Sequence, residues 1–162
     1  MRAYAFLFDL DGVIADWRPR LKHRDAGDWD TFYKEMPYDE VLPAGAVTYN
    51  LMATQCRILG HAIREKGLDA DAPMVDIVTC RPEKMRAVTI TWLASNGLIM
   101  PRNLHMRPDD DERPHHEIKL DMYRQFYEGK EAVMALFEDN LDIIQAFEAI
   151  GITCVHMREG NA

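Results

Sequence analysis

Two aspartates, Asp9 and Asp11, lie two positions apart directly after an apolar run near the start of the chain. The run at residues 4–8 has the length and composition of a buried strand, and Gly12 indicates a tight turn after it. Open α/β sheets bind their ligands at the carboxyl ends of strands, which is where these carboxylates would lie. Carboxylates this close repel each other, so the pair implies a bound cation or a shared proton. The spacing suits a nucleophile beside an acid/base over Mg²⁺, and the alternative is an ordinary surface turn.

A hydroxyl and a guanidinium follow the second apolar run, in the segment Thr79-Cys80-Arg81-Pro82. A threonine hydroxyl at the end of a strand can donate to a phosphoryl oxygen, and the N–H groups of a helix starting at Pro82 would assist it. Arg81 can hold a phosphate through two parallel hydrogen bonds. The alternative is that Thr79 only caps the helix and that Arg81 is a solvated residue of its first turn.

Lys119 lies in a segment that is predicted to be helical, shortly after the adjacent His115 and His116. An amine here can neutralise a carboxylate nucleophile and a transferring phosphoryl group together, whereas most helix lysines are simply solvated. Adjacent side chains at a helix start point about 100° apart and chelate a metal poorly, so we expect the two histidines to have a loop or capping role.

Glu138 and Asp139 end another predicted strand. Their carboxylates would complete a hard-oxygen Mg²⁺ site with Asp9 and with Asp11, the latter through a nearby backbone carbonyl. The alternative is that Asp139 or Asn140 only caps the helix that follows, which is a common role at such a position.

Predicted strands and helices alternate along the chain, and this order implies an α/β fold with a doubly wound parallel sheet of five strands. Apolar residues Val47, Leu51, Ile58 and Leu59 share one face of the longest helix. Residues 15–42 break the periodicity and predict a small lid inserted after the first strand, with one short helix at 29–34. The other expected elements are strands at 74–78, 104–106, 132–137 and 152–156, and helices at 43–66, 82–96, 117–127 and 141–150.

The composition indicates one globular domain over residues 1–162, because 48% of residues are hydrophobic and 28% are charged. No apolar run approaches the roughly 20 residues of a membrane span. The N-terminus has no apolar region typical of a signal peptide. Three cysteines, Cys56, Cys80 and Cys154, are scattered without paired spacing, so we expect neither disulfides nor structural zinc. This cysteine usage favours a cytoplasmic protein.

The formal net charge of −8 argues against a protein that coats nucleic acid, since such binding needs phosphate neutralisation by basic side chains. One basic segment nevertheless adjoins the first turn; it contains Arg18, Arg20, Lys22, His23 and Arg24. Its place beside the predicted phosphate site favours a role in guiding a nucleic-acid end or a nucleotide, and the alternative is a solvated loop.

The order of these motifs resembles that of the haloacid dehalogenase (HAD) superfamily of phosphatases. Within it, the chain is most similar to the 3′-phosphatase domain of phage-type polynucleotide kinase/phosphatase enzymes, over nearly its whole length. The matching segments are FDLDGV at 8–13, Arg20, IVTCRPE at 77–83, LHMRPDDDERPHHEIKLDMY at 104–123 and ALFEDNLDIIQAFEAIGITC at 135–154.

The resemblance implies a HAD-like, Rossmann-type fold that removes 3′-phosphates from DNA or RNA ends with Mg²⁺ and an aspartyl-phosphate intermediate. In this family pattern Asp9 is the nucleophile and Asp11 is the general acid/base. In the same pattern Thr79 and Lys119 contact the phosphoryl group. The remaining roles are substrate binding by Arg20, Arg81 and Arg113, and metal binding by Asp9, Asp11, Glu138 and Asp139.

Three positions depart from the family pattern: Val13 replaces the usual Thr, Glu138 replaces Asp, and His115 stands where Asp is common. The chain also contains no GxxxxGK[ST] motif and therefore no P-loop kinase half. A small-molecule phosphatase such as a 5′-nucleotidase stays open as an alternative. A catalytically silent binding module is the third possibility, but it has no physical need for so many clustered charges.

Overall fold

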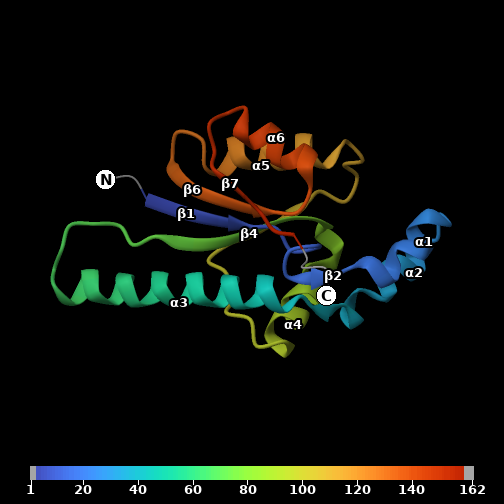
Figure 1. Cartoon of the computed structure of the whole chain (residues 1–162), viewed down its shortest axis with the longest axis horizontal. Helices are drawn as coiled ribbons and strands as arrows, with labels where there is room; N and C mark the ends of the chain where they lie inside the picture. Colours follow the sequence, from blue (N-terminus) through green and yellow to red (C-terminus); the bar gives the residue numbers. More distant parts are fainter. Residues whose placement is uncertain (1–2, 159–162) are drawn as a thin grey trace.

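Five parallel strands form the central sheet of the computed structural model, which describes residues 3–158 (Figure 1). The strands are β1 Ala3–Phe8, β4 Met74–Pro82, β5 Leu104–Arg107, β6 Glu131–Glu138 and β7 Cys154–His156. Their order in the sheet is β5-β4-β1-β6-β7, and every neighbouring pair is parallel. This arrangement confirms the predicted doubly wound α/β fold, and it brings the carboxyl ends of β1, β4 and β6 together at one edge.

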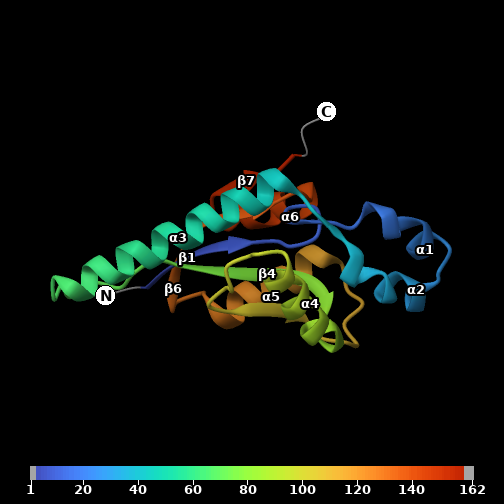
Figure 2. The same ribbon diagram turned by 90° about the horizontal axis from the view of Figure 1, so that it is seen from below.

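Helices cover both faces of the sheet, as the two ribbon views show (Figures 1 and 2). On one face lie α3 Pro43–Glu65 and α4 Arg86–Ser95; on the other lie α5 His115–Phe126 and α6 Leu141–Glu148. Alternate side chains of β1 enter the two cores: Leu7 joins the cluster around Phe147, and Phe8 packs against Tyr49 on α3. The period of two along β1 therefore fixes which face of the sheet each helix covers.

The start of α4 differs from the prediction. β4 continues through Arg81 to Pro82, a 3₁₀ turn follows at Glu83–Met85, and α4 begins only at Arg86. A proline disfavours helical backbone in the residue before it, which keeps Arg81 extended. The helix N-terminus that was expected beside Thr79 is therefore displaced along the chain, and it does not adjoin that hydroxyl.

The lid, residues 15–42, projects beyond the carboxyl ends of the strands (Figure 2). It begins and ends in a short antiparallel ribbon of β2 Ala15–Asp16 and β3 Glu40–Val41. Between these strands lie a 3₁₀ turn at Arg18–Arg20, α1 Leu21–Asp25, α2 Trp29–Lys34 and a second 3₁₀ turn at Met36–Tyr38. Only α2 was predicted, because a helix as short as α1 shows no apolar periodicity in the sequence.

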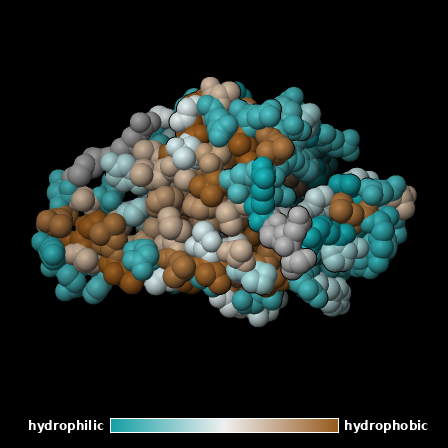
Figure 3. All heavy atoms as spheres, viewed as in Figure 1, coloured by the Kyte–Doolittle hydropathy of each residue, from teal (hydrophilic) through white to brown (hydrophobic). Residues whose placement is uncertain are grey.

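The apolar face that was predicted for α3 points to solvent. Val47, Leu51 and Ile58 are each more than half exposed, and hydrophobic residues gather along this edge of the space-filling view (Figure 3). The buried side of α3 carries mainly small residues instead, together with Tyr49. Although α3 is long, no helix in residues 3–158 is long and apolar enough to cross a membrane.

Small residues are required because α3 approaches the turn after β1 at backbone contact. A Cβ atom added to Gly45 would lie 1.6 Å from the carbonyl oxygen of Val13, next to Gly12 of that turn. Gly45 is buried in the first turn of α3, so neither backbone has room to move apart without opening the core.

We expect Gly45→Ala to lower the free energy of unfolding by about 1–3 kcal/mol, as overpacking does, although alanine has the higher helix propensity. Gly60→Ala in the same helix is the matched control, because its added Cβ would meet only side-chain atoms, the Ala72 methyl at 3.0 Å and Nη1 of Arg64 at 3.5 Å. Urea unfolding of both variants measures the difference. Equal stability of the two variants would show that the contact with Val13 is easily relieved.

Candidate active site

The turn after β1 brings the ends of β1 and β6 into contact. The Asp9 amide donates to the carbonyl of Phe137 at 2.9 Å, and Gly12 adopts a φ of 90°. A Cβ atom on Gly12 would lie 2.0 Å from the carboxylate of Asp139. Glycine at this position therefore provides the backbone conformation and also lets Asp139 lie against the turn.

Lys119 holds two of the carboxylates at the end of the sheet. Its buried ammonium lies 2.7 Å from Oδ1 of Asp9 and 2.6 Å from Oε2 of Glu138. The other oxygen of Glu138 accepts the backbone N–H groups of Asp139 and Asn140, each at 3.1 Å. Glu138 is therefore fixed from both sides and positions the lysine.

Three carboxylates form a group that could hold a cation. Each of Asp9, Glu138 and Asp139 contributes one carboxylate oxygen, and these three oxygens lie within 4.8 Å of one another. Asn140, rather than Asp139, caps α6, because its side-chain oxygen accepts the N–H groups at the start of that helix. The capping alternative for Asp139 is therefore wrong. The carboxylate of Asp11 does not belong to this group and faces Arg81 instead.

The charges of this group favour a bound cation. Burial and repulsion by Glu138 raise the pKa of Asp9 to about 7. Burial and repulsion by Asp9 raise the pKa of Asp139 to about 6. Burial opposes the charge of Lys119, but the carboxylates of Asp9 and Glu138 outweigh it and raise its pKa. One ammonium serves three acids, so a divalent cation with oxygen ligands fits the remaining negative charge.

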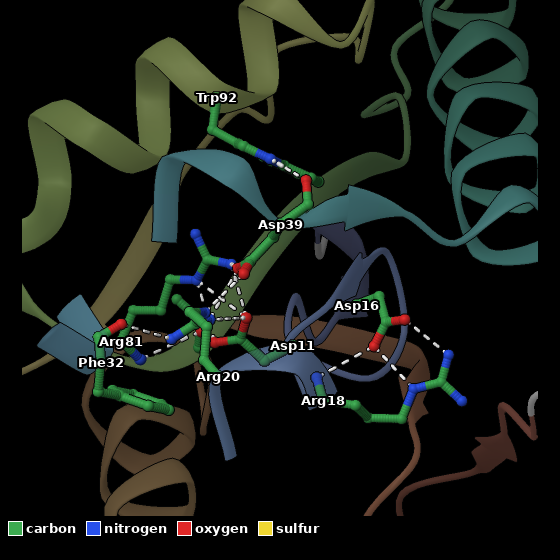
Figure 4. Close-up of polar contacts among 9 residues, drawn as sticks. Asp11, Asp16, Arg18, Arg20, Phe32, Asp39, Arg81 and Trp92 are labelled. Atoms are coloured by element: carbon green, nitrogen blue, oxygen red, sulfur yellow. Dashed lines mark hydrogen bonds and ion pairs between the residues drawn. The ribbon is translucent and has the colours of Figure 1, made fainter. Parts of the chain in front are cut away.

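A second network of charges joins Asp11 to the lid (Figure 4). Arg81 donates to Asp11 from Nε and Nη2, at 3.0 and 2.6 Å, and Nη2 also reaches Asp39 at 2.8 Å. Arg20 binds the same Asp39 through Nε and Nη2, at 2.5 and 2.7 Å. Burial acts to raise the pKa of Asp11, but Arg81 and then Arg20 outweigh it and lower the pKa.

The two arginines have different access to the site. Arg81 lines the cavity, and among the described residues its Nη1 has no hydrogen-bond partner. Arg20 is buried behind Asp11, where its guanidinium stacks on Phe32 at 4.4 Å from the ring centroid. Arg81 therefore borders the space where a group could bind, whereas Arg20 supports Asp11 and Asp39 from the lid side.

A cavity of about 770 Å³ opens above these networks, between the sheet and the lid. Its wall includes all of the predicted site residues except Arg20; they are Asp9, Asp11, Thr79, Arg81, Arg113, Lys119, Glu138 and Asp139. Thr79 caps no helix, since its hydroxyl accepts the N–H of Arg81 at 3.2 Å. Arg113 lies at the exposed rim, paired with Asp111 and Asp121.

The chain matches the family model "HAD_PNKP: Polynucleotide kinase PNKP phosphatase domain" over residues 3–162. It belongs to this family. Two similar solved structures are titled "Structure of Pnkp1/Rnl/Hen1 complex" and "Structure of the Pnkp1/Rnl/Hen1 RNA repair complex". The first is 22% identical, with a TM-score of 0.69, and the alignment covers 98% of this chain and 47% of that chain. The second is 21% identical, with a TM-score of 0.73, and the alignment covers 99% of this chain and 44% of that chain.

The chain thus spans less than half the length of these two neighbours. A HAD-superfamily hydrolase from Geobacter sulfurreducens PCA is 15% identical, with a TM-score of 0.50 and coverage of 95% of this chain and 89% of that one. No curated protein matches the chain. Family membership makes this protein a HAD-type phosphatase, and the distant structures support its fold.

Two features of this PNKP-family site were not anticipated from the sequence. His115 lies in the first turn of α5 and lines the cavity, where burial and Lys119 lower its pKa. The carboxylate of Asp39 joins Arg20 to Arg81, and its backbone carbonyl accepts the indole N–H of Trp92 at 2.8 Å. No pattern in the lid sequence distinguishes Asp39 from its exposed neighbours, because its burial arises only from the fold.

The basic segment of the lid is largely neutralised by acids of the lid itself. Arg18 binds Asp16 through two hydrogen bonds, and Arg24 binds Asp25 at 2.9 Å. Arg20 pairs with Asp39, and Nε2 of His23 lies 3.1 Å from the carboxylate of Glu35. The expected cationic surface beside the phosphate site is therefore mostly a set of local ion pairs.

We expect Asp39→Asn to lower the free energy of unfolding by about 3–5 kcal/mol, because it leaves two buried guanidiniums sharing one carboxylate. The variant should also lower kcat/KM, since Arg81 and Arg20, which both act on Asp11, lose their common partner. Asp16→Asn is the matched control: it removes an Asp–Arg pair at the lid surface and should cost less than about 1 kcal/mol. Similar losses in both variants would contradict a special role for Asp39.

The raised pKa values of Asp9 and Asp139 give metal binding a pH dependence. Both carboxyls hold protons more tightly in the folded than in the unfolded protein, so the stability that they contribute is lost as pH rises towards about 7. Mg²⁺ should compensate this loss by replacing the protons. We expect Mg²⁺ to raise Tm more at pH 8 than at pH 5.5, and calorimetry should detect proton release on binding.

Asp139→Asn tests the metal group without disturbing the helix cap, which Asn140 provides. Removing one carboxylate charge should raise the Mg²⁺ concentration needed for half-maximal activity roughly tenfold or more, because ligand charge largely sets the affinity of such sites. Asp142→Asn, an exposed change in the first turn of α6, is the control. Unchanged Mg²⁺ dependence in Asp139→Asn would remove Asp139 from the metal site.

Proposed function

We propose that this chain is a Mg²⁺-dependent phosphomonoester hydrolase that removes 3′-phosphates from polynucleotide ends through an aspartyl-phosphate on Asp9. The observation that carries this proposal is the contact of Lys119 with Asp9 in the wall of a cavity that Arg81 also lines. A phosphate bound in this cavity would meet the Asp9 carboxylate as nucleophile together with cationic donors. Such an arrangement suits in-line phosphoryl transfer.

In the first step an oxygen of Asp9 attacks phosphorus and the ester oxygen leaves. Lys119 neutralises the charge that would otherwise repel the two anions, and Glu138 keeps the ammonium in place. Mg²⁺, held by Asp9, Asp139 and the backbone near Asp11, would supply further positive charge to the phosphoryl oxygens. Thr79 and Arg81 would donate hydrogen bonds to the same oxygens.

Asp11 acts as the acid and then as the base. In the structure it is paired with Arg81, which lowers its pKa and keeps it ionised. A phosphate dianion would compete for the guanidinium of Arg81, and Asp11 would then accept a proton more readily. Protonated Asp11 donates to the leaving oxygen, and the resulting carboxylate takes a proton from the water that hydrolyses the aspartyl-phosphate.

The substrate class rests on the family and on the two similar structures from an RNA repair complex. We propose that the chain acts on a nucleic-acid 3′ end, as part of an end-repair process that other proteins complete. Its cysteines are free thiols, which fits a cytoplasmic protein. The neutralised basic segment favours a second candidate, hydrolysis of small phosphate esters such as nucleoside monophosphates.

One experiment compares the two candidates. We expect the purified protein with Mg²⁺ to hydrolyse a 3′-phosphorylated oligonucleotide with a higher kcat/KM than nucleoside 3′- or 5′-monophosphates, measured by phosphate release. Preference for a mononucleotide would establish the second candidate instead.

The nucleophile is tested by Asp9→Asn, which nearly keeps the shape of the side chain but cannot form an acyl-phosphate. Activity should fall by at least about 10³-fold, as is usual when a covalent nucleophile is removed. Residual Mg²⁺-dependent activity well above that level would rule out the covalent mechanism.

A further inference from the structure

The outer part of the cavity has a different chemistry from the phosphate site. Four aromatic residues of the lid, Trp17, Trp29, Phe32 and Tyr33, contribute to its wall. A volume of about 770 Å³ is far more than a phosphate needs and is typical of sites for larger ligands. The rest of the substrate, next to its phosphate, therefore meets the aromatic side of the lid.

Among these residues Trp29 has the most accessible ring. Its side chain is 49% exposed, whereas Phe32 is buried. Trp29 lies edge-on to Phe32 at 5.5 Å and nearly parallel to Tyr33 at 6.1 Å between centroids. These two neighbours hold the indole in place, and about half of it remains available for a planar ligand.

Tyr33 is held by the body of the protein rather than left open. Lys84 lies over its ring at 4.9 Å, and Arg107 donates to its hydroxyl at 3.3 Å. These contacts join the lid to the segments that follow β4 and β5. Tyr33 is therefore a support, and Trp29 is the surface that a ligand can cover.

The charges around the aromatic wall nearly balance. The basic residues there are Arg24, Lys84, Arg107 and Arg113, and the acidic ones are Asp109, Asp111 and Glu112. Two of the arginines are already paired, Arg24 with Asp25 and Arg113 with Asp111 and Asp121. Backbone phosphates of a polynucleotide would gain little here, whereas stacking of a base needs no net charge.

We infer that the lid forms a nucleobase subsite, in which Trp29 stacks on an unpaired base adjacent to the 3′-phosphate. This inference rests on the proposed function and specifies its substrate as a single-stranded or frayed polynucleotide end. A base within a duplex has both faces covered by its neighbours and cannot stack on Trp29 without leaving the helix. Stacking supplies most of the affinity beyond the phosphate, so that affinity depends weakly on salt.

The test compares two 3′-phosphorylated single-stranded oligonucleotides, one intact and one that lacks the two bases nearest the phosphate. For the wild-type protein we expect kcat/KM to be higher on the intact strand. Trp29→Leu should reduce the ratio between the two substrates by about 5- to 100-fold, the range expected for one base–aromatic stack. Trp29→Phe retains a ring and should recover most of the ratio.

Tyr38→Ala is the matched control, because Tyr38 is an aromatic lid residue that is 82% exposed and lies outside the cavity wall. For Tyr38→Ala, the ratio of kcat/KM on the intact strand to kcat/KM on the strand that lacks two bases should equal that of the wild type. Equal losses on both substrates in Trp29→Leu, or a steep decrease of kcat/KM on the intact strand with salt, would overturn the subsite and leave the phosphatase intact. Failure of the wild type on both oligonucleotides, with activity on small esters, would instead refute the proposed function.

Discussion

The placement of one buried ammonium determines much of this site. Lys119 contacts Asp9 and Glu138 at salt-bridge distance, and without it two buried carboxylates would face each other with no compensating charge. Lys119 of α5 lies between these two carboxylates and offsets their repulsion at the ends of β1 and β6. Burial, together with repulsion that Lys119 does not offset, raises the pKa values of Asp9 and Asp139 and makes the site suited to a divalent cation.

The arginine network extends this dependence to the lid. Asp39 binds Arg20 of the lid and Arg81 of the sheet, and both arginines act on Asp11. Asp11, the proposed acid/base, is therefore held by an arginine of the sheet and an arginine of the lid. A movement of the lid would change the partners of Arg81, so the ionisation of Asp11 is linked to the geometry of the lid.

The sequence predicted the sheet, most helix boundaries and the residues that meet at the edge of the sheet. This was possible because the carboxyl ends of parallel strands lie at the same edge, independently of the loop conformations. It failed where contacts between distant segments decide the outcome. The apolar face of α3 points to solvent because Gly45 must lie against Val13. β4 runs on to Pro82 because Arg81 stays extended, and Asp39 is buried by a lid whose fold has no periodicity to detect. The function of the individual site residues remains a prediction.

The pairing of lid arginines with lid acids limits how strongly the lid can bind intact nucleic acid. Intact nucleic acid offers a vast number of competing, undamaged stretches, and proteins with open basic surfaces are held on them by counterion release. Here Arg18 and Arg24 are each engaged by a neighbouring carboxylate. The lid therefore gives long phosphate backbones little to bind, and under the proposed function this would leave the protein less occupied by undamaged stretches.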